Sequence, residues 1–260
     1  MIDIQNTNDS RNVDIQHVGI KNLNMPLIVQ RKNSSDQVVS AEARVSVSLP
    51  KHYKGTHMSR FVEVLTEWQN KHLLGVDIKG CIEKIIKKLN AQNGEVEFKF
   101  IYYIDKQSPV KKKSAPMSYN CSFEGRINNG EYKFILGVEV PVTTLCPCSK
   151  EISDFGAHNQ RALIKVKISY DETEQIWIED LVEMVEKCAS SPLYTLLKRE
   201  DEKFVTEQAY KNPKFVEDIL RDVVLNLRKN KVIREFEVDC EAIESIHNHS
   251  AWAHQHEFND

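Results

Sequence analysis

The sequence lacks several features that would place it in well-known functional classes. No apolar stretch approaches the roughly 20 residues that a membrane-spanning helix needs. No glycine-rich phosphate loop or dinucleotide-binding fingerprint occurs. Neither sign of charge dominates, because 35 basic residues stand against 38 acidic ones and the net charge is −3. Nucleic-acid-binding domains usually carry a basic face, so we expect neither a membrane nor a nucleic acid as a partner.

A secretion signal and a disulfide framework are also missing. The first eleven residues are polar, unlike a secretory signal or a transit peptide. Four of the six cysteines fall on apolar faces of predicted elements, where a free cysteine behaves as a small hydrophobic residue. We therefore expect a cytoplasmic protein without disulfides. Cys146 and Cys148 are the exceptions, because they lie in a proline-containing loop that offers no role in the core.

Turn signals and composition divide the 260 residues into an arm and two modules. Residues 1–39 contain many Asn and Gln and show no clear apolar period. We expect a loosely ordered N-terminal arm there, with at most a short strand near residues 13–18. Asn129-Gly130 is a turn signal. It marks the boundary between a first module, residues 40–128, and a second module, residues 129–260.

Both modules show strands around a pair of amphipathic helices. In residues 41–49 apolar and polar side chains alternate, which predicts a half-buried strand. From Ile78 to Leu89 the apolar residues recur every three to four positions, which predicts a helix. The second module repeats this order. We predict an α+β fold of antiparallel sheets with two helices on one face. Because small sheets leave open edges, we expect several modules to close into barrels in a homo-oligomer.

The first candidate for chemistry is Cys146-Pro147-Cys148, followed ten residues later by His158. Pro147 is expected to prevent a helix and to fix the local φ, so both thiols are expected on a rigid, exposed loop. Zn²⁺ accepts thiolate and imidazole ligands together. The pattern therefore favours a metal site, and the alternative is two loop thiols beside a surface histidine.

Further candidates lie elsewhere along the chain. In an extended chain, His247 and His249 face the same side, whereas His254 and His256 are expected in a polar tail without a role. The charged run from Leu197 to Lys203 offers a carboxylate ligand, or else is only a solvated loop. His57 and Arg60 at a predicted helix start resemble an anion site. Lys111-Lys112-Lys113 is expected to be a flexible basic loop that can help to hold phosphates.

Several of these segments together resemble the signature of the type IB GTP cyclohydrolases, over most of the chain from about residue 40. The resemblance is carried by the stretch from Pro141 to Arg161 and by four shorter ones: Gly55 to Phe61, Asp201 to Tyr210 (DEKFVTEQAY), Pro213 to Asp218, and Glu244 to His249. It implies the tunnelling fold, with modules assembled into barrels and active sites at subunit interfaces. A homotetramer is what the family suggests.

The resemblance also implies a reaction and a set of residues. GTP and water would give formate and 7,8-dihydroneopterin triphosphate, the first step toward tetrahydrofolate. The metal ligands would be Cys146, His158, Glu202 and His247, although the Glu200-Asp201-Glu202 cluster leaves the carboxylate open. Glu217 would anchor the guanine ring and Glu244 would lie beside the metal. Zn²⁺, Mn²⁺ and Fe²⁺ all suit such mixed ligands.

These residue types suit the chemistry. A bound metal lowers the pKa of water toward about 7 and so supplies a nucleophile at neutral pH. Cys146 would bind as a thiolate, and His249 or Glu244 would protonate the departing ring nitrogen. Glu217 would accept two N–H groups of guanine. The triphosphate needs cations, and the candidates are His57, Arg60 and Lys113.

Two alternatives remain open from the sequence. One is another tunnelling-fold enzyme of pterin or deazapurine metabolism, such as a nitrile reductase that uses a covalent cysteine and NADPH. The other is an oligomeric scaffold in which Cys146, Cys148, His158 and His247 close a structural zinc site. The role of Cys148 is open as well.

Overall fold

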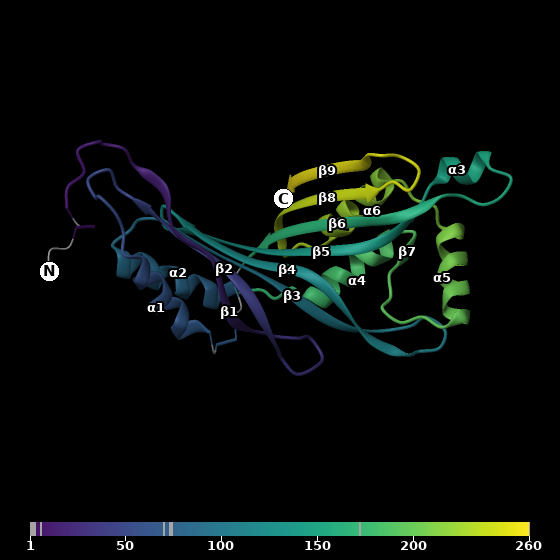
Figure 1. Ribbon diagram of the computed structural model, residues 1–260, viewed down its shortest axis with the longest axis horizontal. Helices are drawn as coiled ribbons and strands as arrows, with labels where there is room; N and C mark the ends of the chain where they lie inside the picture. The colour runs from purple at the N-terminus through teal and green to yellow at the C-terminus, as the bar shows by residue number, and fades with distance from the viewer. Residues whose placement is uncertain (1–3, 6, 70, 73–74, 172, 260) are drawn as a thin grey trace. The chain divides into compact units, whose positions relative to one another are not determined.

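The computed structural model describes residues 4–5, 7–69, 71–72, 75–171 and 173–259. Its helices and strands are labelled in Figure 1. In chain order they are β1 (Ile15–Val29), β2 (Gln37–Leu49), α1 (Met58–Trp68), α2 (Gly75–Leu89), β3 (Gly94–Gln107), β4 (Ser114–Asn128), β5 (Glu131–Leu145), α3 (Pro147–Ile152), β6 (Asn159–Tyr170), α4 (Ile178–Cys188), β7 (Ser191–Pro192), α5 (Arg199–Lys211), α6 (Val216–Lys229), β8 (Ile233–Ile243) and β9 (Ser250–Phe258).

The strands hydrogen-bond in the order β1-β2-β3-β4-β5-β6-β8-β9, and the short strand β7 pairs with β5. β2 lies antiparallel to both β1 and β3, so that Ala43 faces Leu23 on one side and Phe98 on the other. The predicted α+β class with antiparallel pairing is confirmed. Strands β2 to β4 come mainly from the first predicted module and β5, β6, β8 and β9 from the second, whereas β1 lies in the segment predicted as an arm.

The chain forms two compact units. The first unit contains Met1–Ile101, Ser122–Leu136 and Tyr170–Gln175, and the second unit contains Tyr102–Cys121, Gly137–Ser169 and Ile176–Asp260. The chain passes from one unit to the other within β3, β4 and β5, at the last residue of β6, and again before α4. The units therefore do not coincide with the contiguous segments 40–128 and 129–260.

In the first unit, α1 and α2 pack side by side on the strands (Figure 1). Their buried faces are the predicted ones, with Phe61 and Leu65 on α1 and Ile78 and Ile82 on α2. The strands come close beneath α2, since a Cβ atom on Gly125 would lie 2.5 Å from Cγ2 of Ile78. A glycine in β4 therefore allows α2 to pack this closely against the sheet.

In the second unit, α4 and α6 pack together, and α6 covers β8 and β9. Val185 on α4, Ile219 and Val223 on α6, and Val238 on β8 are fully buried. Cys240 is buried in the same layer, and burial raises the pKa of its thiol to about 12. The prediction that four cysteines serve as core residues is confirmed for Cys81, Cys121, Cys188 and Cys240. Within the described residues, no helix is both long and apolar enough to span a membrane.

The prediction of a loosely ordered N-terminal arm is wrong for residues 15–29. They form β1, which pairs with β2 along its whole length and buries Met25, Leu27 and Val29. The pairing register shifts twice, between Ile15 and Val18 and between Ile20 and Leu23. Each such bulge inserts a residue and breaks the two-residue alternation by which a strand is recognised in a sequence.

The prediction that His254 and His256 lie in a tail is also wrong. Both belong to β9, which pairs with β8 over its whole length. His256 Nε2 lies 3.0 Å from Glu235 Oε1, and His254 Nδ1 lies 3.6 Å from Asp239 Oδ2. The strand was hidden because its exposed face carries large rings such as Trp252, while its inner face carries Ala and Gln.

The close pairing of β1 with β2 gives a test of this correction. A Cβ atom on Gly19 would lie 1.9 Å from the carbonyl oxygen of Val45, a backbone atom that cannot move alone. Gly19→Ala is therefore expected to lower the free energy of unfolding by about 1–3 kcal/mol in urea titrations. Gly55→Ala is the control, because its new Cβ would make only ordinary contact with Gln5. Equal stability of the two variants would mean that β1 is not an integral strand.

Candidate active site

The second unit contains a cavity of about 260 Å³. Its lining comes from the ends of β5 and β8, the starts of β6, β9 and α6, and the segments that join them. Of the predicted site residues, six line this cavity: Cys146, His158, Glu217, Glu244, His247 and His249. Cys148 does not line it, and its side chain is exposed.

Cys146 caps the N-terminus of the short helix α3. Its Sγ accepts the backbone N–H of Ser149 at 3.4 Å. Pro147 occupies the first position of that helix, so the expectation of a loop without helix is wrong. The first helical turn needs no N–H donor from its leading residue, and proline is well tolerated there. The cap directs the thiol of Cys146 into the cavity. Cys148 is the second residue of α3 and lies outside the cavity.

His158 is held by both its backbone and its ring. Its carbonyl oxygen accepts the N–H of Cys146 at 3.1 Å, and its own N–H donates to Ser149 Oγ at 3.2 Å. Its Nδ1 lies 2.9 Å from Gln160 Oε1 and 3.8 Å from Glu244 Oε2. An amide oxygen can only accept, so Nδ1 carries the proton. The lone pair of the neutral ring is then on Nε2.

Gln160 was not singled out from the sequence, yet it organises this wall of the cavity. Its Nε2 donates to Thr144 Oγ1 at 3.0 Å and to Glu244 Oε1 at 3.3 Å, which leaves Oε1 for His158. Such a partner fixes the tautomer and orientation of a ligating histidine. The only signal in the sequence is its position two residues after His158, on the same side of β6.

The opposite wall is built by the segment after β8 and by the start of α6. The rings of His247 and His249 stack at a centroid distance of 5.0 Å and 8° between planes, which confirms that both face the same side. The N–H of Lys214 donates to the carbonyl oxygen of Leu145 at 3.0 Å and ties the lead of α6 to β5. Glu217 follows in the first turn of α6. Its exposed carboxylate makes no hydrogen bond or ion pair with other described residues.

The predicted carboxylate ligand lies elsewhere. Glu202 is exposed in the first turn of α5 and does not line the cavity. The far end of α5 adjoins the cavity region, since Lys150 Nζ donates to the carbonyl oxygen of Tyr210 at 2.6 Å. Glu202 precedes the last residue of α5 by nine positions, about 13 Å along the helix axis. Among the described residues, no three His, Cys, Asp or Glu side chains lie close enough together to hold a metal ion.

The contacts of Glu200, Asp201 and Glu202 show which of these three carboxylates is available as a metal ligand. Asp201 is fully buried and accepts backbone N–H groups, and Glu200 forms an ion pair with Lys111 at 2.8 Å. Glu202 makes no side-chain hydrogen bond or ion pair with described residues. Its carboxylate alone of the three remains available to a ligand.

The predicted phosphate-binding residues do not line the cavity. His57 precedes α1 in the first unit, and Arg60 donates from Nη1 to the carbonyl oxygen of Lys88 at 3.3 Å. Lys113 lies in the β3–β4 loop of the second unit, where its N–H donates to Ser108 Oγ. None of these three side chains meets the cysteine and histidines within the second unit of one chain.

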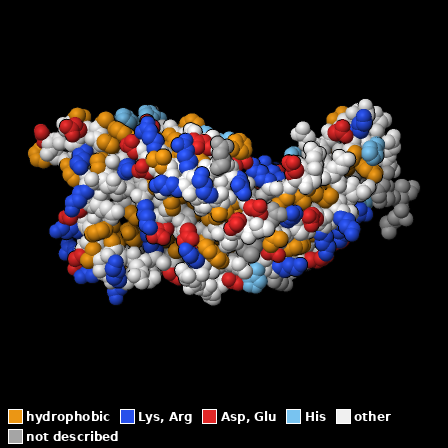
Figure 2. Space-filling model, turned by 180° about the vertical axis from the view of Figure 1, so that it is seen from behind, with side chains coloured by type: hydrophobic (Ala, Val, Ile, Leu, Met, Phe, Trp, Pro, Cys, Tyr) orange, Lys and Arg blue, Asp and Glu red, His pale blue; other side chains and the backbone are white. Residues whose placement is uncertain are grey.

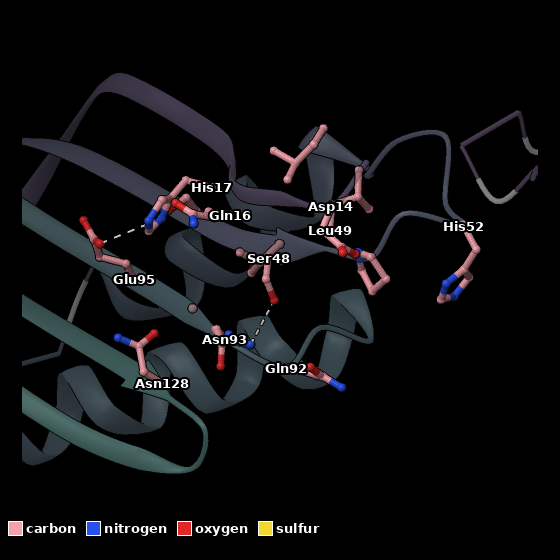
Figure 3. Close-up of a pocket in the computed structure, with 15 residues that line it drawn as sticks. Asp14, Gln16, His17, Ser48, Leu49, His52, Gln92, Asn93, Glu95 and Asn128 are labelled. Carbon is pink, nitrogen blue, oxygen red and sulfur yellow. Dashed lines mark hydrogen bonds and ion pairs between the residues drawn. The ribbon is translucent and has the colours of Figure 1, made fainter. Parts of the chain in front are cut away.

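A larger cavity of about 570 Å³ lies in the first unit (Figure 3). The bulge in β1 places His17 over Ser46 Oγ at 3.2 Å and 4.0 Å from Glu95 Oε2. Glu95 is already paired with Arg44 at 2.5 Å, and no thiol lines this cavity. Its described acidic and imidazole side chains form no group of three that could hold a metal ion.

The donor chemistry around the smaller cavity fits a metal ion. Thiol and imidazole are ligands of Zn²⁺ and related ions, and the Nε2 lone pair of His158 is the one that Gln160 leaves available. Glu202, the carboxylate predicted as a ligand, does not line this cavity, although Glu217 and Glu244 do. The cysteine and the histidines therefore fit part of the predicted coordination sphere.

The chain is similar to known proteins over nearly its whole length. A family described as Type I GTP cyclohydrolase folE2 matches residues 1–253. GTP cyclohydrolase FolE2 of Thermosipho africanus (strain TCF52B) is 51% identical over 97% of this chain and 96% of its own length. GTP cyclohydrolase FolE2 of Geotalea uraniireducens (strain Rf4) is 48% identical over 97% and 92%.

Solved structures show the fold. The uricase from Arthrobacter globiformis matches with a TM-score of 0.54 at 7% identity, over 94% of both chains. A uricase from Bacillus fastidious matches with a TM-score of 0.57 at 9% identity, over 94% of this chain and 93% of that one. At such low identity the likeness concerns the fold alone. It confirms the tunnelling fold, and assembly into barrels stays a prediction.

The buried carboxylate of Asp201 gives a test by pH. Burial raises its pKa, but N–H donors from Lys111, Lys198 and Val110 outweigh this and lower the pKa to about 2. Because the folded pKa lies below the unfolded one, Asp201 stabilises the fold above about pH 4 and loses that effect as the pH falls toward 2. We expect Asp201→Asn to be less stable than the wild type at pH 7 in urea unfolding.

The stability gap between these two proteins should shrink as the pH is lowered from about 5 to about 2. Glu200→Gln is the matched control, because that carboxylate is exposed and its ion pair within the described part of the chain is with Lys111 alone. A gap that stays constant over this range would show that Asp201 is not ionised in the folded protein.

Proposed function

The chain belongs to the type I GTP cyclohydrolase FolE2 family, and from this premise we propose a metal-dependent hydrolysis of GTP at C8. The products would be formate and 7,8-dihydroneopterin triphosphate, a first step toward tetrahydrofolate. The observation that supports this reaction is the meeting of Cys146, His158 and Glu217 in one cavity of a chain that matches the family over residues 1–253. The cytoplasmic location stays a prediction.

Cys146, His158 and His247 would hold the metal together with Glu202. Cys146 would bind as a thiolate and His158 through Nε2, because its Nδ1 is committed to Gln160. A bound divalent ion of this kind supplies an activated water at neutral pH. Zn²⁺, Mn²⁺ and Fe²⁺ are all compatible with these ligands.

The other cavity residues would bind the base and move a proton. Glu217 stands without a partner among the described residues, so its carboxylate is available to accept two N–H groups of guanine. Glu244 is engaged by Gln160 at 3.3 Å. His249 is exposed and stacks on His247, and its one polar contact with the described residues is a long one, 3.4 Å to the carbonyl oxygen of Ser250. We therefore assign the protonation of the departing ring nitrogen to His249 and give Glu244 a supporting role.

Glu202 would reach the metal from a second copy of the chain. It lies about 13 Å along α5 from the helix end beside its own cavity, yet it is the carboxylate that remains unpaired. A homotetramer with sites at subunit interfaces would place it on the cavity of a neighbour. The edge strands β1 and β9 are the surfaces on which barrels would close.

A structural zinc site is the weaker alternative. It would need Cys148 as a fourth ligand beside Cys146, but Cys148 is exposed and does not line the cavity. A nitrile reductase of this fold would use Cys146 as a covalent nucleophile and NADPH as the reductant. Such a reaction needs no metal ligands and would give the neighbouring imidazoles no role.

The reaction is tested by incubating the metal-loaded protein with GTP. Formate and a pterin that fluoresces after oxidation are expected as products. Parallel samples with Zn²⁺, Mn²⁺ and Fe²⁺ cover the candidate metals. Absence of both products in all three samples would contradict the proposal.

The two neighbouring thiols should behave differently. Cys146→Ala is expected to abolish turnover and to lower metal content strongly, because it removes a ligand. Cys148→Ala is the matched control and should keep metal binding, because its side chain lies outside the cavity. Metal content by elemental analysis and circular dichroism check binding and folding. Metal loss in the Cys148 variant alone would mean that the wrong sulfur was assigned.

Mixed oligomers test where Glu202 acts. Cys146→Ala and Glu202→Ala are each expected to be inactive alone. In randomly mixed oligomers about a quarter of the sites would combine an intact Cys146 with an intact Glu202 from a neighbour. Turnover should therefore reappear on co-expression. If the mixture stays inactive, Glu202 serves the cavity of its own chain.

A further inference from the structure

The short helix α3 adds no side chain to the core of the second unit. None of its six residues, all within the described part of the chain, is buried. Ile152 at its end is 85% exposed, and Phe155 just beyond it is 95% exposed. In Figure 1 α3 stands off the ends of β5 and β6, and in Figure 2 this segment lies at the upper left, where hydrophobic and acidic side chains protrude. The position of α3 therefore depends on hydrogen bonds, because it lacks the buried apolar face that holds the other helices.

Most of these hydrogen bonds lie within the connection between β5 and β6. The N–H of Lys150 donates to the carbonyl oxygen of Cys146, and the N–H of Ser153 donates to that of Ser149, both at 3.1 Å. The bond between Ser149 Oγ and the N–H of His158 closes the same connection on itself. These contacts shape the connection, but they do not set how α3 lies relative to α5 and α6.

Lys150 makes the contact that does so. Its Nζ donates to the carbonyl oxygen of Tyr210 at 2.6 Å and lies 4.4 Å from the centroid of the Tyr210 ring. Tyr210 is in the last turn of α5, where carbonyl oxygens have no partner within the helix and the helix dipole favours a cation. Among the described residues, no other side chain of α3 forms a hydrogen bond or ion pair with an element outside the connection.

The end of α5 is itself fixed, and it leads to the base-binding wall of the cavity. Asn212 Nδ2 donates to the carbonyl oxygen of Ala189 at 2.8 Å. The lead of α6 is tied to the end of β5 by a backbone hydrogen bond, and Glu217 follows in the first turn of α6. Lys150 therefore connects the helix that is capped by the Cys146 thiol to the segment that carries Glu217.

This connection bears on the geometry of the proposed reaction. Cys146 and Glu217 line the cavity, whereas Lys150 does not, so any effect of Lys150 on the reaction has to pass through α3. The reacting atoms of a hydrolysis must be held at a defined separation, and a displacement of about 1 Å can cost up to roughly a hundredfold in rate. Cys146 would set one side of this separation, and Glu217 would set the other.

We propose that Lys150 is a positioning residue, which attaches α3 to the end of α5 and so holds Cys146 at a fixed distance from the base bound by Glu217. This inference rests on the proposed function, because it takes Cys146 as a metal ligand and Glu217 as the anchor of the guanine ring. The attachment of α3 to α5 does not rest on that function, since it follows from the contacts of Lys150 with Tyr210.

The variant Lys150→Met tests the inference, because methionine has a similar shape and no charge. We expect kcat for GTP to fall about tenfold or more, since the reacting atoms are no longer held in place. KM, metal content and the unfolding midpoint in urea should stay near those of the wild type. An unchanged kcat would overturn the inference. A fall in kcat that accompanies metal loss or a lower unfolding midpoint would also overturn it, because it would reveal a purely structural role.

Two further variants are the controls. Lys150→Arg keeps a charged N–H donor and should retain most of the wild-type kcat. Lys187→Met removes the same charge from an exposed lysine of α4, which pairs with Glu183 at the surface, and should behave like the wild type. If Lys150→Arg or Lys187→Met loses as much activity as Lys150→Met, the bond to Tyr210 does not explain the loss and the inference is wrong.

A double-mutant cycle with Tyr210→Leu shows whether Lys150 acts through α5. Tyr210→Leu removes the ring near Nζ and leaves the carbonyl oxygen, so it should lower kcat less than Lys150→Met does. The double variant should be no slower than Lys150→Met, because the contact is already lost in that variant. Losses that multiply in the double variant would give the two side chains separate roles and contradict the attachment.

Hydrogen exchange, measured by mass spectrometry, separates failure of this inference from failure of the proposed function. In Lys150→Met the amides of residues 146–158 should exchange faster than in the wild type and in Lys187→Met. If the wild type turns over GTP while kcat and exchange are unchanged in Lys150→Met, the inference fails and the function stands. If the wild type does not turn over GTP, faster exchange supports the attachment without the function, and unchanged exchange overturns the attachment as well.

Discussion

The backbone hydrogen bond from Cys146 to the carbonyl oxygen of His158 is the contact on which the candidate site depends. This hydrogen bond joins the two ends of the segment that connects β5 to β6 and contains α3. Ser149 stands inside this closure, where its N–H caps the thiol of Cys146 and its hydroxyl accepts the N–H of His158. A thiol and an imidazole twelve positions apart in the chain are thereby held on one wall of one cavity.

The hydrogen bonds distinguish two kinds of residue. Some have their polar groups fully bonded and hold the structure in place, and others have polar groups that are available to a ligand. Gln160 is saturated, with bonds to Thr144, Glu244 and His158. Asp201 is saturated too, with three backbone donors. The carboxylates of Glu217 and Glu202 have no such partners among the described residues. Positioning groups are costly to leave unbonded when buried, whereas ligand-binding groups remain exposed until a ligand arrives.

Much of the fold could be predicted from the sequence, because helices α1, α2, α4 and α6 each bury a regular apolar stripe. β1 could not be predicted, since two bulges break its alternation. β9 could not either, because its exposed face is rich in large rings. The convergence of Cys146 and His158 was predictable from their spacing. The roles of Gln160 and Asp201 depend on tertiary hydrogen bonds that no local pattern records. Glu202 lies outside the cavity of one chain, and no sequence pattern indicates this.

The metal environment of the zinc-loaded protein, measured by X-ray absorption spectroscopy, tests the site most directly. One sulfur ligand together with imidazole nitrogen is expected, because Cys146 lines the cavity and Cys148 does not. That sulfur should persist in Cys148→Ala and vanish in Cys146→Ala. Two sulfur ligands, or none, would contradict a site built on Cys146 and His158.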